Sequence, residues 1–453
     1  MAVGLDRAAI ADALEQASTT KHLVLEPGLV HRVGEVVSSV FPGQPVLLVH
    51  DDVTWDLAGA AIHASLVAAG QPVLPPVALH GVPIVKPDMP RTALVRAAIG
   101  AAGDGVLPLA VGSGTLNDVT KRAAFEAGVP YAVFGTAASM DGYTASGAAM
   151  IVDGVKQTLA CDAPVMVLAD SDILAAAPAA MTASGYGDLL GKITAGADWL
   201  IADTLQIEAI VQPAWEAVQG PLRGLLADAA RYATGDVAAV EQLFLALAGS
   251  GLAIQATGSS RPASGSEHQF SHLWEMRGLE WQGVPVSHGF KVGLGSLVSS
   301  ALYERLLLRD FSMIDVDALV REAASWETVE AEVRLLHPNA AIREKSLEET
   351  RAKYVTEETL GHRLELLRDH WPELSKKLRA QLPRTEALRD WLAAAGCPVT
   401  PEEIGLDRAQ LRESYLAAMH IRRRYTVFDL ARNAGVFEQL VDEVFAPGGY
   451  WSV

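Results

Sequence analysis

The chain has 453 residues and a formal net charge of -18 at pH 7. Because a single hydrophobic core stops growing at about 250 to 300 residues, we expect two domains. The charge disfavours nucleic acid and anionic membrane as partners, because clustered Lys and Arg supply most of such affinity. Cys161 and Cys397 have no spacing that favours a disulfide framework or a thiolate metal site. With no basic leader and no run of about 18 apolar residues, we expect a cytoplasmic protein without a membrane span.

From about residue 45 the sequence alternates short apolar runs with helical patterns. PVLLVHDD precedes the helical pattern LAGAAIHASLVAAG, and further apolar runs follow as far as residues 163–174. Strands that alternate with helices predict a mostly parallel sheet covered on both faces. After about residue 175, apolar residues recur at helical spacing and β-branched runs nearly disappear. We predict an α/β nucleotide-binding domain over residues 1–175 and an all-α domain over residues 176–453.

The segment GSGTLND joins an apolar run to a helical pattern. A strand that leads through glycine into a helix N-terminus lets backbone N–H groups approach an anion such as a dinucleotide pyrophosphate. Gly112, Ser113, Gly114 and Asp118 are therefore candidate cofactor-binding residues. The glycines also fit a βα turn that needs them only for its backbone angles, and the segment departs from GxGxxG, so both interpretations stay open.

A second segment of small residues, GTAASMDGYTASG over residues 135–147, ends the next predicted strand. In a parallel sheet the carboxyl ends of neighbouring strands face the same crevice. Asp51 and Asp52 follow an earlier strand, where a carboxylate can accept hydrogen bonds from a ribose diol and repel a 2'-phosphate. This favours NAD over NADP, although acids after a strand also cap helices.

His268 and His272 are four residues apart in SGSEHQFSHLWEM, so they project from one face of a predicted helix, and His288 follows after a loop. These three lie close together in a chain with 12 histidines. A divalent ion bound there also needs a carboxylate, and Asp188, which we place at the beginning of a helix, is the candidate. Histidines at this spacing are often structural and Asp188 also fits an N-terminal helix acid, so both interpretations stay open.

Five motifs occur in one order: GSGTLND, TAASMDGYTASGAAM, GYGDLLGK, GSEHQFSH and SHGFKVG. With them the chain resembles the sn-glycerol-1-phosphate dehydrogenases of the bacterial AraM type. These belong to the wider group of metal-dependent alcohol, glycerol and dehydroquinate-synthase-like enzymes. The resemblance covers nearly the whole chain and implies a Rossmann-like N-terminal domain, a helical C-terminal domain, an active site in the cleft between them and a homodimer.

The resemblance also implies roles for single residues. Asp188, His268 and His288 match the metal ligands of the family, while His272 and Asp141 match its substrate-facing histidine and aspartate. The residues that match the cofactor site are Gly112, Ser113, Gly114, Thr136 and Ser139. The chain departs from the family at DGYTASG, where Ala145 stands in place of a serine expected to touch the cofactor.

The activity implied by the resemblance is the reversible reduction of dihydroxyacetone phosphate to sn-glycerol 1-phosphate by NADH or NADPH. One divalent metal would assist, with zinc or nickel ranked before iron. A glycerol or other polyol dehydrogenase and a dehydroquinate-synthase-like lyase are the alternatives. Candidates for the phosphate site are Lys156, Lys192, Arg261 and Lys291, although each also fits an ordinary surface residue. We expect the basic run HIRRRY, residues 420–425, on a solvated or ion-paired helix face.

Overall fold

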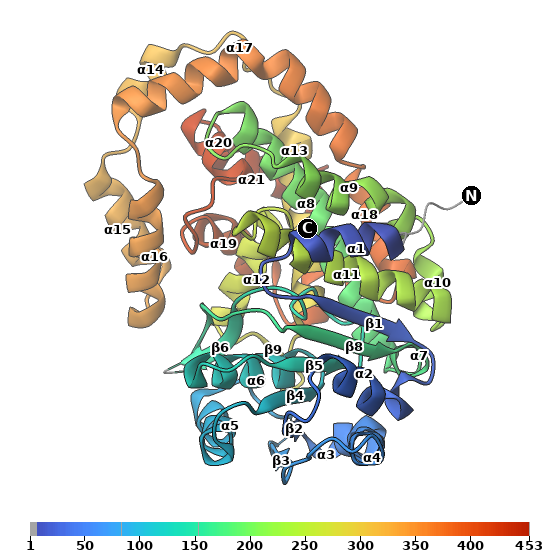
Figure 1. The fold of residues 1–453 in the computed structure, drawn as a ribbon. Helices are drawn as coiled ribbons and strands as arrows, with labels where there is room; N and C mark the ends of the chain where they lie inside the picture. The colour runs from blue at the N-terminus through green and yellow to red at the C-terminus, as the bar shows by residue number, and fades with distance from the viewer. Residues whose placement is uncertain (1–6, 83, 153, 453) are drawn as a thin grey trace. The chain divides into compact units, whose positions relative to one another are not determined.

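The computed structural model describes residues 7–82, 84–152 and 154–452 (Figure 1). It contains two compact units. The first comprises the described residues up to Leu189 together with Arg223–Ser259, and the second comprises Leu190–Leu222 together with the described residues from Ser260 onward. The predicted division at residues 175 and 176 stays a prediction.

The first unit is built on a six-stranded sheet whose strand order is β1-β8-β5-β4-β2-β3. Neighbouring strands pair in parallel throughout, which confirms the predicted sheet. The strands are β1 His22–Glu26, β2 Val46–His50, β3 Val77–Ala78, β4 Leu107–Gly112, β5 Ala132–Gly135 and β8 Met166–Asp170. An antiparallel hairpin, which the sequence analysis did not predict, lies outside this sheet and consists of β6 Ala148–Val152 and β7 Val155–Leu159.

Helices follow the strands of the first unit as the alternating pattern predicts. Before and between the strands lie α1 Arg7–Gln16, η1 Leu29–His31, α2 Val33–Val40, α3 Asp52–Thr54, η2 Trp55–Gly59, α4 Ala60–Ala68, α5 Met89–Ala102 and α6 Gly114–Ala127. After the last strand come α7 Ser171–Ala175, α10 Ala229–Ala233 and α11 Val237–Thr257, while α8 Ala179–Thr204 and α9 Gln212–Leu226 contribute residues to both units.

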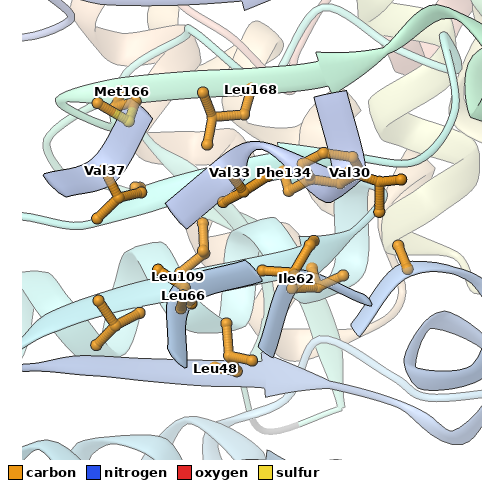
Figure 2. Packing of buried hydrophobic residues seen from close by; sticks show 14 of the residues in the cluster. Val30, Val33, Val37, Leu48, Ile62, Leu66, Leu109, Phe134, Met166 and Leu168 are labelled. Carbon is orange, nitrogen blue, oxygen red and sulfur yellow. The ribbon is translucent and has the colours of Figure 1, made fainter. Parts of the chain in front are cut away.

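One face of the sheet is covered by α2 and α4 (Figure 2). Every second residue of a strand points to the same face, and all residues of β2, β4, β5 and β8 are buried. Such strands read as continuous apolar runs because both of their faces are covered. The residues that pack together on this face include Val33, Val37, Leu48, Ile62, Leu66, Leu109, Phe134 and Leu168.

Helix α11 is long and apolar, and α1 and α7 pack against it. By length and composition alone it could cross a membrane. In the structure 78% of its apolar window is buried, and a core helix of a water-soluble protein passes the same test. Its hydropathy is therefore explained by packing inside this unit.

The strand order reverses between β2 and β4. The chain leaves β2 for the edge strand β3, then returns past β2 to form β4, which pairs with β2 in parallel. Ligands of open parallel sheets bind at the carboxyl ends of the strands on either side of such a reversal. Asp51 follows the end of β2 and Ser113 follows the end of β4, so the predicted cofactor residues flank this point.

The second unit is helical, as predicted. Its described helices are α12 Ser266–Met276, α13 His288–Leu306, α14 Val316–Glu322, α15 Trp326–Leu336, α16 Ala340–Lys353, α17 Glu357–Gln381, α18 Thr385–Ala394, η3 Pro401–Ile404, α19 Arg408–Ala418, α20 Val427–Asn433 and α21 Phe437–Phe445. A short hairpin of β9 Glu280–Trp281 and β10 Val284–Pro285 joins α12 to α13. Helices α12 and α13 pack against each other, which brings their histidines together.

Candidate active site

The turn after β4 lies beside the turn after β5. Gly112 and Gly135 pair across the two strands, and the Oγ atoms of Ser113 and Ser139 lie 2.7 Å apart. A Cβ added to Gly112 would lie 2.3 Å from Cδ1 of Leu116, so close packing of the strand end against α6 requires glycine. The two segments of small residues therefore meet at one edge of the sheet, where α6 begins with Gly114.

The structure shows the local contacts or burial of three other predicted cofactor residues. Asp51 caps α3, because its Oδ1 accepts a hydrogen bond from the Thr54 backbone N–H at 2.8 Å. Asp118 accepts a hydrogen bond from the Ala149 N–H at 3.3 Å, and Thr136 is buried after β5. The capping role of Asp51 is the alternative that the sequence left open, and the cofactor roles of all three stay predictions.

Asp188 is fully buried and lies within α8, which begins at Ala179. The prediction that it begins a helix was wrong, so a favourable interaction with the helix N-terminus does not explain this buried acid. Its Oδ2 accepts a hydrogen bond from the backbone N–H of Asp141 at 2.9 Å. The predicted substrate residue is thus held next to the predicted metal ligand.

Ala145 is buried where the family pattern has serine. Its carbonyl accepts a hydrogen bond from Nζ of the buried Lys121 at 2.8 Å, and Lys121 also donates to the carbonyls of Gly142 and Gly147. Burial lowers the pKa of this lysine. The segment that carries Asp141 and Ala145 is therefore fixed by a buried cation bonded to its backbone.

The three predicted histidines gather in the second unit. The ring centroid of His268 lies 6.0 Å from that of His272 and 5.3 Å from that of His288, and the last two are 6.0 Å apart. His268 and His272 share one face of α12, as their spacing predicts. His288 is the first residue of α13, whose N-cap Ser287 accepts a hydrogen bond from the Phe290 N–H.

Two glutamates that the sequence analysis did not single out hold these rings by their Nδ1 atoms. Nδ1 of His268 lies 2.7 Å from Oε1 of Glu267, and Nδ1 of His288 lies 3.0 Å from Oε1 of Glu275. The other oxygen of Glu275 lies 3.4 Å from Nδ1 of His272. Glu275 stands three residues after His272 and seven after His268, so helical spacing was the signal that could have found it.

One ligand atom from each of Asp188, His268 and His288 lies within 4.8 Å of the others. Their donor set, two imidazole nitrogens and one carboxylate oxygen, suits zinc, nickel or iron. Because the Nδ1 atoms of both histidines face carboxylates, their Nε2 atoms point away from these carboxylates and are the candidate ligand atoms. The residues present therefore fit a divalent metal ion.

A buried acidic network continues behind His268. Thr194 Oγ1 donates to Oε2 of Glu267 at 2.7 Å, and the Gly265 N–H donates to its Oε1 at 2.6 Å. Asp198 accepts hydrogen bonds from the Tyr303 hydroxyl at 2.6 Å and from the Ser266 N–H at 2.6 Å. Burial, reinforced by the Glu267 carboxylate, raises the pKa of Asp198 to about 6. The start of α12 is thus anchored by bonds that satisfy these buried carboxylates.

His272 differs from the other two histidines. Its side chain is 21% exposed, and burial lowers its pKa to about 4, against the opposing effect of Glu275. The ring is therefore neutral at pH 7. A neutral imidazole can accept a proton at one nitrogen while the other donates.

The basic run at residues 420–425 does not lie on a helix, because α19 ends at Ala418 and α20 begins at Val427. The expected helix is therefore wrong, whereas Arg423 is exposed and ion-paired with Glu349, as expected. Instead, the connection between α19 and α20 packs against the segment that precedes α12: Arg424 donates to the carbonyl of Ser264, and Gln269 Nε2 donates to the Arg424 carbonyl at 3.2 Å. The sequence carried no signal for this contact, because the two segments are far apart in the chain.

The chain is similar to known proteins in sequence and in fold. The family described as "Iron-containing alcohol dehydrogenase" matches residues 24–178. The glycerol-1-phosphate dehydrogenase (NAD(P)+) of Bacillus velezensis is 33% identical over 345 residues, which cover 76% of this chain and 74% of that protein. The protein of the same name from Pyrococcus horikoshii is 29% identical over 283 residues, which cover 62% of this chain and 78% of that protein.

A solved structure of a probable glycerol dehydrogenase from Sinorhizobium meliloti has the same fold. Its TM-score is 0.60 at 17% sequence identity, over 93% of this chain and 97% of that one. The glycerol dehydrogenase of Schizosaccharomyces pombe gives a TM-score of 0.57 at 16% identity, over 94% of this chain and 90% of that one. These likenesses confirm the predicted dehydroquinate-synthase-like fold.

Proposed function

The chain belongs to the glycerol-1-phosphate dehydrogenase family of oxidoreductases, and we propose that it reduces dihydroxyacetone phosphate reversibly to sn-glycerol 1-phosphate. NADH or NADPH supplies the hydride, and one divalent metal ion assists. The observation that carries the proposal is the gathering of Asp188, His268 and His288 around one point. A protein of this family without catalytic activity would not require all three of these residues.

Asp188 and the Nε2 atoms of His268 and His288 would hold the metal ion. When bound, such an ion stabilises negative charge that develops on the substrate oxygen. We rank zinc and nickel first, since an N,N,O donor set suits both.

His272 is the proposed proton relay. Its neutral ring faces Glu275 through Nδ1, so its other nitrogen can accept the alcohol proton in the oxidation direction and return it in the reduction direction. Asp141, fixed by its N–H bond to Asp188, is proposed to orient a substrate hydroxyl. His272 would therefore transfer the proton, and Asp141 would orient the substrate. The metal ligands would keep the positive charge of the ion near the substrate oxygen.

The nicotinamide cofactor is proposed to bind at the carboxyl ends of β2 and β4. Ser113 precedes the first residues of α6, whose backbone N–H groups can approach a pyrophosphate. Asp51 caps α3 through Oδ1, and a carboxylate at this place would repel a 2'-phosphate, which favours NAD. We further propose a homodimer acting in the cytoplasm and supplying a glycerol phosphate for phospholipid synthesis.

The proposal is tested by NADH and NADPH oxidation with dihydroxyacetone phosphate. The protein is stripped of metal and re-supplied with zinc, nickel or iron, and each is assayed separately. We expect turnover that depends on both the metal and the phosphorylated substrate. Turnover of dihydroxyacetone alone would indicate a polyol dehydrogenase, and conversion of a substrate without net NADH consumption would indicate a lyase. If no metal restores turnover with dihydroxyacetone phosphate, the proposed function is wrong.

A further inference from the structure

Three consecutive arginines between α19 and α20 have very different surroundings. Arg423 is bound to Glu349 through Nε and Nη2, both at 2.9 Å, and its side chain is 58% exposed. Arg424 binds the carbonyls of Ser260 and Ser264 and also the Ser260 hydroxyl. The guanidinium groups of both are therefore used to fix the chain.

The side chain of Arg422 is half-buried, and its guanidinium makes fewer hydrogen bonds to the protein than those of Arg423 and Arg424. Within the described part of the chain, its guanidinium makes one hydrogen bond, from Nη1 to Oγ of Ser264 at 3.3 Å. A guanidinium has five N–H donors in a planar fork that matches the oxygens of a phosphate. Four donors of Arg422 thus remain for a ligand.

The position of Arg422 relates it to the histidines. Ser264 stands two residues before Ser266, where α12 begins, so its contact places the guanidinium at the start of the helix that carries His268 and His272. The cation therefore lies near the beginning of the helix that carries the ring proposed to face the substrate.

The carboxylates near Arg422 are paired with other residues. Glu349 is bound to Arg423. Glu267 accepts a hydrogen bond from Thr194 and lies against Nδ1 of His268. Glu275 interacts with His288 and with Lys291 Nζ at 3.2 Å. Burial lowers the pKa of Arg422 against the attraction of these acids, but a guanidinium remains protonated at neutral pH. An incompletely bonded cation in a half-buried position favours an anionic ligand.

Three of the four phosphate candidates named from the sequence are less suitable. Nζ of Lys291 donates to the Val286 carbonyl at 2.7 Å and interacts with Glu275. Arg261 is bound to Glu208 at 2.8 Å and to the Tyr425 carbonyl at 3.0 Å. Lys192 is completely buried.

We propose that Arg422 binds the phosphate group of the substrate and thereby makes the site select a phosphorylated triose over an unphosphorylated one. This inference rests on the proposed function and identifies the side chain that recognises the phosphate group. Two N–H groups of the fork would face two phosphate oxygens, while the Ser264 hydroxyl keeps the guanidinium oriented.

The first test compares Arg422→Gln and Arg422→Lys with Arg423→Gln as the matched control. We expect Arg422→Gln to raise the KM for dihydroxyacetone phosphate about 10- to 100-fold, because hydrogen bonds to a charged group are lost. The KM for dihydroxyacetone should change less than about 3-fold, and Arg422→Lys should restore part of the phosphate selectivity. Equal losses with both substrates, or loss of bound metal from Arg422→Gln, would overturn the proposal.

A second test does not depend on turnover. Binding of inorganic phosphate and of sn-glycerol 1-phosphate to the metal-loaded wild-type protein is measured by calorimetry in a phosphate-free and sulfate-free buffer. We expect both to bind the wild type and Arg423→Gln, and to bind Arg422→Gln at least about 10-fold more weakly. Equal binding by wild type and Arg422→Gln, or no binding by the wild type, would overturn the role of Arg422. Failure of the proposed function is distinct, because it appears as absent turnover in wild type with every metal.

Discussion

Nδ1 of His268 lies 2.7 Å from Oε1 of Glu267, the residue that directly precedes it in the chain. Glu267 is itself fixed by Thr194 and by the backbone of Gly265. A carboxylate in this position sets which ring nitrogen carries the proton and makes the other nitrogen a stronger ligand. His288 has the same relationship to Glu275. The proposed metal site is therefore prepared by two buried carboxylates.

Glu267→Gln should weaken metal binding about 10- to 100-fold while the protein still folds. The amide keeps an acceptor for the ring but removes the charge that raises the basicity of His268. Affinity for zinc is measured by competition with a chromophoric chelator. Glu344→Gln, which changes an exposed acid on α16, is the control. Unchanged affinity in Glu267→Gln would contradict this role.

His268→Ala and His272→Ala should have different effects. His268→Ala should abolish metal retention, because it removes a proposed ligand. His272→Ala should leave the metal bound and lower kcat, since only the proton relay is lost. Metal content after gel filtration and steady-state rates are measured on the same samples. Equal metal loss from both variants would show that the two histidines are not divided in this way.

The parallel sheet and the helical second half were predictable because both leave local patterns in the sequence. Buried strands such as β4 appear as unbroken apolar runs, and helices such as α15, α18 and α21 show helical periodicity. The spacing of His268 and His272 placed them on one helix face. By contrast, Asp188 was assigned to a helix start because the glycines before it looked like a boundary, whereas α8 continues through them.

Contacts between distant segments could not be predicted in this way. Arg422 stands at Ser264 only because the connection after α19 packs against the segment before α12. The run of arginines predicted a charged surface, since charge runs usually face solvent. The sequence contains no local signal that separates Arg422, with one hydrogen bond, from Arg423 and Arg424.

Gly295→Ala should destabilise the packing of α13 against α12. A Cβ at this position would lie 2.5 Å from the carbonyl oxygen of Glu267, and that backbone has little room to move. We expect a loss of about 1–3 kcal/mol in the free energy of unfolding, together with weaker zinc binding. Gly100→Ala on α5 is the control, because nothing lies within 4 Å of its added Cβ. This control should stabilise the protein by about 0.5–1 kcal/mol. Urea unfolding measures both, and equal effects would exclude the contact as the cause.

His337 should make the metal-free protein less stable as the pH falls. Its side chain is buried, and only a weak interaction with the Ala417 backbone favours the protonated ring. Burial, together with repulsion from His420 and Arg277, lowers the pKa of His337 to about 3 from its ordinary 6.5. The unfolded chain therefore takes up a proton below pH 6.5 while the folded chain does not.

The contribution of His337 to the free energy of unfolding is complete above pH 6.5. It is lost progressively as the pH falls towards 3, at up to about 1.4 kcal/mol per pH unit. His337→Leu should remove this part of the slope. The measurement is urea unfolding of metal-free wild type and variant at several pH values between 7.5 and 4.5. Burial also lowers the pKa of His420, so the variant keeps a smaller slope of the same sign. Parallel curves for wild type and variant would show that His337 is not responsible.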